Sequence, residues 1–216
     1  MPGDGKELRG AGTARAANRG ERGKYINAMV TTAIIFLLGG CGPVLVADEL
    51  VLAPQVSVTP INIGSGAKVY LTVLDERLQR SLADFTLGPF NYRHTDSASG
   101  DPGHLFQESL RMGLLNLGFE VLPSPEVSPV SLEIQLRSLQ YYPLHDGKGG
   151  LEGYAFVAAA WAEIRRGETH VFQKRWESAS NSKGFTRRWR EEKINAAFSD
   201  LIAKILGDLE LLTALK

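Results

Sequence analysis

Cys41 is the only cysteine of the 216-residue chain, and it directly follows an apolar run that begins at Val30 and closes with Gly39-Gly40. A short apolar run that follows positive charge and ends in small residues is typical of an export signal. A bilayer-spanning helix needs about 20 apolar residues, so this run is too short to serve as one. Without a second cysteine no internal disulfide can form, and packing alone must stabilise the part of the chain that folds.

The stretch Leu38-Gly39-Gly40-Cys41 resembles the lipobox of bacterial lipoproteins. The resemblance implies cleavage just before Cys41 and a diacylglycerol lipid on its sulfur. The alternative is a buried core cysteine, which fits poorly in a glycine-rich stretch. We therefore predict residues 1–40 as a lipoprotein signal peptide, whose amino terminus is longer than such a signal needs and suggests a misassigned start codon.

The charge of the remaining chain argues against nucleic acid as a partner. Residues 1–40 hold six of the 24 basic and three of the 24 acidic side chains, which leaves 18 basic and 21 acidic groups for residues 41–216. Proteins that bind nucleic acid carry a basic patch or stripe, and this part of the sequence has none. Its length suits one domain with a sizeable core plus a tether.

The first part of the chain after Cys41 is predicted to lack a fold of its own. Residues 41–67 contain three prolines and show no sustained helical period. We predict them as a lipid-anchored tether, to which the alternation around Val56 and Val58 adds at most a short edge strand. The polar segment from Asp75 to Gly103 is predicted as a long loop, with at most one short strand near Phe90 to Tyr92.

Residues 68–216 are predicted to form a single α+β periplasmic domain: a two-layer sandwich in which an antiparallel-rich sheet carries two helices packed on one face. Asp101 followed by Pro102 is typical of a helix start, and Gly118 of a left-handed helix end. An apolar stripe from Ile194 to Leu209 predicts the second helix. Alternation of apolar and polar residues predicts four strands, which are Lys68–Leu74, Val130–Tyr141, Tyr154–Arg165 and Val171–Ser178, and Phe119–Leu122 is expected to be extended chain after the first helix.

This order of elements resembles the YajG-type family of small bacterial lipoproteins. The matching residues are Val69–Arg77, Leu117–Val121, Leu132–Leu136 and the closing helix from Ile194, and the resemblance covers most of residues 50–215. The helix followed by Gly-Phe also recurs in the amino-terminal domain of TolB and in LpoB-type activators. The family resemblance implies an outer-membrane location facing the periplasm. Gly42 agrees with it, because the usual inner-membrane retention signal is an aspartate at that position.

Two groups of residues are candidates for binding a partner. Asp75 and Arg77 follow the first predicted strand two residues apart, so they share a face and are placed to form an ion pair. The alternative is a solvated pair of small energetic weight. Arg187, Arg188 and Trp189 combine cations with an aromatic ring near the start of the last helix, which suits anionic headgroups or a glycan. The alternative is a solvated helix start with Trp189 packed over the sheet edge.

The sequence predicts no metal site, no cofactor and no catalytic residue. A metal site needs three or four converging ligands, whereas the four histidines are spread over segments predicted as two loops, a helix start and a hairpin. We predict them as loop histidines; they are His94, His104, His145 and His170. No serine lies in a Gly-x-Ser-x-Gly elbow.

We therefore expect a non-enzymatic binding or adaptor protein of the cell envelope. It would be anchored to the outer membrane through the amino-terminal lipid and would bind an envelope protein or a glycan. Two alternatives stay open: an accessory subunit of a lipid or lipopolysaccharide transport system, which a deep apolar groove beside the last helix would favour, and a peptidoglycan-acting enzyme, which a cleft with paired carboxylates would favour.

Overall fold

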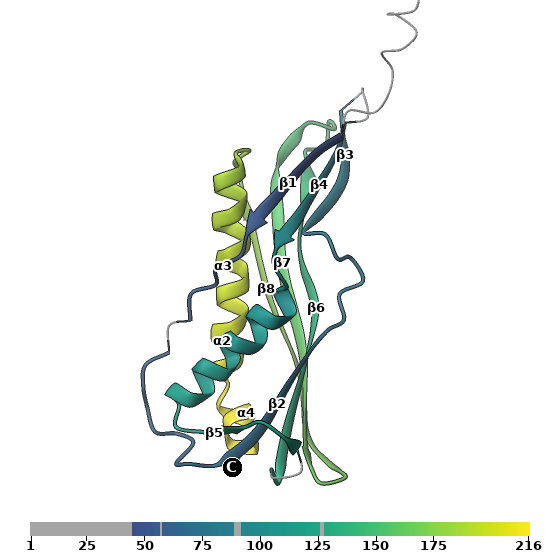
Figure 1. Cartoon of the computed structure of the whole chain (residues 1–216). Coiled ribbons are helices and arrows are strands. Elements are labelled where there is room, and N and C mark those ends of the chain that lie inside the picture. The colour runs from purple at the N-terminus through teal and green to yellow at the C-terminus, as the bar shows by residue number, and fades with distance from the viewer. Residues whose placement is uncertain (1–44, 57, 89–91, 126–127) are drawn as a thin grey trace, which may run out of the picture. The chain divides into compact units, whose positions relative to one another are not determined.

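The computed structural model describes residues 45–56, 58–88, 92–125 and 128–216. The predicted signal peptide and the lipobox residues Leu38 to Cys41 lie outside the described residues. The described part contains two β-sheets and three helices (Figure 1), which confirms the predicted α+β class.

The larger sheet has five strands in the order β5-β2-β6-β7-β8. Strands β6, β7 and β8 form the predicted antiparallel meander, whereas β2 runs parallel to both of its neighbours. The sheet is therefore mixed. The strands are β2 (Lys68–Asp75), β5 (Glu120–Leu122), β6 (Val130–His145), β7 (Leu151–Arg166) and β8 (Thr169–Ser182).

Three helices, α2 (Pro102–Asn116), α3 (Arg187–Leu206) and α4 (Leu209–Ala214), pack on one face of this sheet (Figure 1). The predicted start of α2 is confirmed, because the side chain of the N-cap residue Asp101 accepts a hydrogen bond from the Gly103 backbone N–H at 2.8 Å. Gly118 adopts the expected left-handed conformation with φ of 83°.

The alternating pattern of β7 sets the packing of the domain. Phe156, Ala158, Ala160, Ala162 and Ile164 are fully buried on the face that the helices cover. The small alanine side chains allow α3 to approach the sheet closely, and the apolar stripe of α3 fills the space above them. Burial of one large apolar side chain of that stripe contributes roughly 1.5–3 kcal/mol before conformational entropy is subtracted.

A second, three-stranded sheet was not predicted. It has the order β1-β4-β3, with β1 (Leu45–Val51) parallel to β4 (Tyr92–Ser99) and β3 (Ala83–Leu87) antiparallel to β4. The prediction of a long loop over residues 75–103 is therefore wrong for β3 and β4, and the short strand predicted near Phe90 to Tyr92 falls largely outside the described residues. The side chains of β4 are mostly polar, and ion pairs rather than apolar packing hold His94 and Asp96 in place. The strand therefore lacks the alternation of apolar and polar residues from which strands are predicted.

The predicted tether also differs from the structure. Residues 45–51 are a strand of the small sheet, and Leu50 and Leu52 are buried in the common core. The backbone N–H groups of Val51, Ala53 and Gln55 then donate to side chains of α3. The fold therefore begins by Leu45, and the prediction of residues 41–67 as a tether is wrong where these residues pack on the domain.

Candidate functional site

The predicted cluster at the start of α3 is divided by the fold into side chains with different surroundings. Thr186 caps the helix, and its hydroxyl accepts a hydrogen bond from the Trp189 backbone N–H at 3.2 Å. Arg188 is exposed and makes no ion pair with the described residues. Arg187 instead lies against β1, where its guanidinium donates to the Glu49 carbonyl at 2.5 Å. Of the two predicted cations, only Arg188 therefore has a fully free head group among the described residues.

Trp189 packs on the sheet rather than pointing to solvent. Its ring lies 5.3 Å from the Phe156 ring in an edge-to-face arrangement and 6.0 Å from the Tyr154 ring. Gly184 makes this possible, because a Cβ atom at residue 184 would overlap the indole. The alternative that Trp189 packs over the sheet is thus the observed one.

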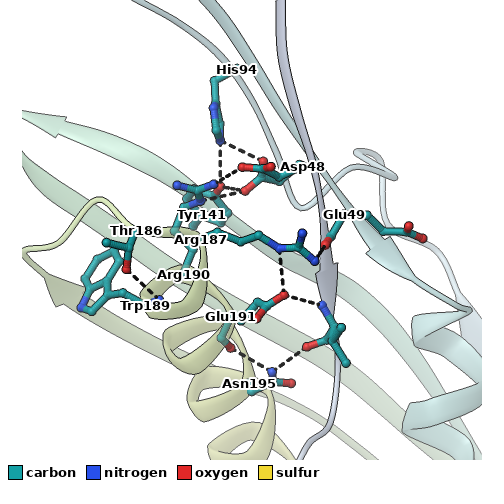
Figure 2. A network of polar contacts seen from close by, with 12 residues as sticks. Asp48, Glu49, His94, Tyr141, Thr186, Arg187, Trp189, Arg190, Glu191 and Asn195 are labelled. Atoms are coloured by element: carbon teal, nitrogen blue, oxygen red, sulfur yellow. Dashed lines mark hydrogen bonds and ion pairs between the residues drawn. The ribbon is translucent and has the colours of Figure 1, made fainter.

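Arg190, one residue further along, is the centre of a buried polar network (Figure 2). Its Nε donates to Oδ2 of Asp96 at 2.9 Å, and Nη2 donates to Oδ2 of Asp48 at 2.5 Å. Its Nη1 donates to the Phe185 carbonyl at 3.0 Å. Asp96 is fully buried and Arg190 is 6% exposed. One guanidinium therefore binds β1, β4 and the segment that leads into its own helix.

Tyr141 and His94 complete the surroundings of Asp96. The Tyr141 hydroxyl donates to Oδ2 of Asp96. His94 Nε2 lies 2.9 Å from Oδ1 of Asp96 and 3.2 Å from the Tyr141 hydroxyl (Figure 2). The prediction of His94 as a loop histidine is therefore wrong, because it belongs to β4 and contacts a buried carboxylate.

These contacts fix the protonation states of the network. Burial by itself would raise the pKa of Asp96, but the hydrogen bonds from His94 and Tyr141 and the charge of Arg190 outweigh it and hold this pKa below its usual range. Burial, followed by the hydrogen bond to Asp96, raises the pKa of Tyr141. At neutral pH the network therefore contains a carboxylate, a guanidinium and a protonated phenol.

The network joins β1, β4, β6 and α3, which makes it a clamp between the small sheet and the rest of the domain. Sequence reasoning missed it, although one signal was present. Arg190 lies four residues before Ile194, on the apolar stripe that continues through Ala197, Phe198 and Leu201. An arginine at a buried stripe position requires a buried acidic partner, so the spacing alone indicates a hidden carboxylate.

The structure brings Asp75 and Arg77 together as predicted. Arg77 donates to both carboxylate oxygens of Asp75, each at 2.9 Å, and Arg80 adds a third contact at 2.8 Å. Arg77 is buried, so the pair is not the solvated one of the alternative interpretation. Burial would raise the pKa of Asp75, but the Arg77 hydrogen bonds outweigh it and lower that pKa. Among the described residues, this pair shares no ion pair with the cluster at the start of α3.

The second face of the five-stranded sheet is covered by none of the described helices or strands. Trp161 of β7 lies on this face, with the Arg137 guanidinium 5.5 Å from the centre of the indole ring. Ala155, Val157 and Ala159 precede Trp161 on the same face of β7, and Tyr142 lies opposite Ala155 on β6. We call Tyr142, Val157, Trp161, Arg137 and Arg175 the open-face patch; Arg175 lies opposite Trp161 on β8.

Two surface hollows lie elsewhere. One, of about 290 Å³, lies between α2 and the free end of β5, with Gln107, Arg111 and Tyr70 in its wall. The other, of about 180 Å³, lies at the ends of β7 and β8, with Glu152 and Lys183 in its wall. Neither has paired carboxylates in its wall, and neither borders α3. Within the described residues no three His, Cys, Asp or Glu side chains converge as metal ligands.

The model of one protein family, described as "Uncharacterized lipoprotein", matches residues 54–216. The chain belongs to this family. Membership agrees with the lipoprotein prediction made from Cys41. No helix of the described part is long and apolar enough to cross a bilayer. A search of curated proteins finds no match.

Solved structures with little sequence identity resemble this member of the lipoprotein family. Protein XCC0632 from Xanthomonas campestris has a TM-score of 0.58 at 10% identity, over 77% of this chain and 95% of that one. A hypothetical protein from Chlamydia trachomatis gives 0.46 at 10% identity, over 69% and 98%. A minor lipoprotein from Acinetobacter baumannii gives 0.39 at 12% identity, over 66% and 91%. The first of these likenesses supports the fold and no more.

Proposed function

We propose that this protein is a YajG-type lipoprotein of the outer membrane, anchored by lipid on Cys41 and facing the periplasm, whose domain binds another envelope protein without catalysing a reaction. The family match supports the lipoprotein class. The Leu38-Gly39-Gly40-Cys41 sequence supports the anchor, and Gly42 in place of an aspartate supports the outer membrane.

The observation that carries the binding role is the open-face patch. All described helices pack on the opposite face of the five-stranded sheet, which leaves Trp161 and its neighbours uncovered by them. Trp, Tyr and Arg are the side chains that contribute most at protein interfaces, and the patch combines all three around small alanines. The Arg137 side chain is held over Trp161 and is also paired with Glu76 at 2.8 Å, so this part of the surface is ordered before a partner arrives.

A photo-crosslinking amino acid placed at Arg175 in intact cells tests this role. Arg175 lies beside Trp161, so we expect one dominant crosslinked envelope protein, and we expect Trp161→Ala to reduce its yield at least tenfold. Met112 is the matched control, because it is an exposed apolar residue on α2, away from the open face. Equal crosslinking from Met112, or no effect of Trp161→Ala, would contradict the proposed surface. Crosslinks to peptidoglycan alone would replace the protein partner with a glycan.

The anchor is tested by mass spectrometry of the protein extracted from membranes. We expect an amino terminus at Cys41 that carries a diacylglycerol group. An unmodified Cys41 in a soluble fraction would remove the lipid anchor from the proposed function, while leaving the test of the open-face patch intact.

A further inference from the structure

The fold begins close to the predicted lipid. Strand β1 starts at Leu45, only four residues after Cys41. A fully extended chain spans at most about 3.3–3.6 Å per residue, so Leu45 lies within about 14 Å of Cys41. If Cys41 carries lipid, as the proposed function requires, the end of the domain where β1 begins is kept at the membrane surface.

Several elements meet at this end of the domain. Figure 1 shows the start of β1, the turn between β6 and β7 and the N-terminal end of α3 at the same end. A chain of contacts connects them: Phe85 stacks on His94, which is paired with β1, and packs 5.9 Å from Tyr154. The ring of Phe185 lies 6.0 Å from Tyr154. We define the anchor-end surface by five side chains, which are Leu45, Lys148, Lys183, Phe185 and Arg188.

Two of these side chains are large, apolar and open to solvent. Leu45 is 63% exposed and Phe185 is 59% exposed. Phe185 directly precedes the N-cap of α3, and its carbonyl is fixed by Arg190 at 3.0 Å. The ring is therefore presented from a held backbone rather than from a free loop. Exposed aromatic and aliphatic side chains of this kind partition into the headgroup region of a bilayer.

Three exposed basic side chains, Lys148, Lys183 and Arg188, lie on the elements that meet at this end. Arg188 and Lys148 are exposed and form no ion pair with the described residues. Lys183 has a single long contact, 3.6 Å from Glu152, and remains exposed. The acidic Asp146 of the same end has its Oδ1 occupied by the backbone N–H groups of the turn, at 2.9 Å from residue 148 and 2.6 Å from residue 150. Lys148, Lys183 and Arg188 therefore present three cationic head groups that complement lipid phosphates, while Glu49 and Asp146 keep their negative charge at this end.

We infer that the anchor-end surface docks on anionic phospholipid headgroups, so that the domain stands on the membrane with β1 and the start of α3 toward the lipid. Phe185 and Leu45 enter the headgroup layer, and the ammonium and guanidinium groups contact phosphates. The lipid supplies attachment, and this surface supplies orientation. Each basic side chain near an anionic surface favours the docked orientation by about fivefold. The inference rests on the lipid anchor of the proposed function, and not on the open-face patch.

The test uses the full mature protein, extracted with its lipid and placed in vesicles of phosphatidylethanolamine and phosphatidylglycerol. Cys41 carries the lipid and is the only native cysteine, so an introduced cysteine takes a fluorescent label uniquely. Labels are placed by Phe185→Cys, by Leu45→Cys and, as a control, by Glu168→Cys in the β7–β8 turn at the other end of the domain (Figure 1). Quenching by lipids with a spin-labelled headgroup is measured for each.

We expect quenching at residues 185 and 45 to exceed that at residue 168 at least threefold. We also expect it to fall to the control level in Lys148→Gln, Lys183→Gln, Arg188→Gln protein or in phosphatidylcholine vesicles. Equal quenching at residues 185, 45 and 168 in lipidated protein would overturn the docking inference and leave the lipid anchor intact. If residue 185 is shielded from solvent in cells but its label is not quenched in vesicles, a protein rather than lipid covers this surface, and the docking inference is overturned. A mass spectrum without lipid on Cys41 overturns both the anchor and the inference.

Discussion

Substitution of Arg190 by methionine is the sharpest test of the buried network. Methionine keeps an unbranched side chain in the apolar stripe of α3 but removes three hydrogen bonds, to Asp96, Asp48 and the Phe185 carbonyl. Asp48 is partly exposed and regains water at small cost. Asp96 has no exposed surface, so its charge remains buried with only Tyr141 and His94 beside it.

The expected cost follows from that stranded carboxylate. Removing one partner of a buried ion pair typically costs about 3–5 kcal/mol, against a total stability of about 5–15 kcal/mol for a domain. For a domain of this length, the same loss lowers the melting temperature by roughly 6–20 °C. Arg188→Met is the matched control. Its guanidinium is exposed and makes no ion pair with the described residues, so we expect a change within about 0.5 kcal/mol.

The assay is urea unfolding followed by tryptophan fluorescence. A double variant, Arg190→Met with Asp96→Asn, separates the stranded charge from the loss of packing. Because it leaves no unpaired buried charge, we expect it to be more stable than Arg190→Met by about 2 kcal/mol. The reasoning is refuted if the free energy of unfolding of Arg190→Met lies within about 1 kcal/mol of that of Arg188→Met. It is also refuted if the destabilisation of the double variant equals the sum of those of Arg190→Met and Asp96→Asn.

Three further predictions concern the same fold. Because the pKa of Asp96 is lower in the folded protein, the unfolded chain binds this proton first as the pH falls, and the stability that is present above about pH 4 declines below it. We expect Asp96→Asn to weaken this decline in the free energy of unfolding, measured from pH 6 to pH 3. Asn195→Leu removes the acceptor of the Ala53 N–H at 2.7 Å, and we expect about 1 kcal/mol of destabilisation with faster hydrogen exchange at that amide. Gly118→Ala combines a left-handed φ of 83° with overlap of the new methyl group with a neighbouring asparagine, whereas Gly149→Ala has a similar φ of 82° and open space. We expect both to cost about 1–2 kcal/mol for the backbone, and Gly118→Ala to cost more, by urea unfolding.

The elements that the sequence predicted are those with local signals. The meander of β6, β7 and β8 alternates apolar and polar side chains, and α2 carries its start at Asp101 and its end at Gly118. Each signal lies within the element that it specifies. The predicted boundaries were too short at the sheet ends, because β8 continues to Ser182 through polar residues that only pairing with β7 holds in place.

The missed elements depend on partners far away in the chain. Asp96 lies in a polar stretch that resembles a loop, and it becomes part of a strand because Arg190, 94 positions later, neutralises it. The candidate residues show the same division. The cluster of Arg187, Arg188 and Trp189 could be predicted from the sequence because its members are adjacent. The network around Arg190 could be predicted only by recognising which face of α3 is buried.

The docking of residues 45–55 on α3 has a simple geometric cause that changes how the anchor works. Glu191, Asn195 and Ser199 lie four residues apart on one side of α3, and they accept the backbone N–H groups of Val51, Ala53 and Gln55 in that order. Four helical residues rise about 6 Å and two extended residues about 6.6 Å, so a helix stripe and a strand edge stay in register over three bonds. A free tether of 25 residues would reach roughly 25–30 Å, whereas the four residues before Leu45 span at most about 14 Å. With lipid on Cys41, the end of the domain where β1 begins is therefore held within about 14 Å of the lipid, rather than at the end of a long free tether.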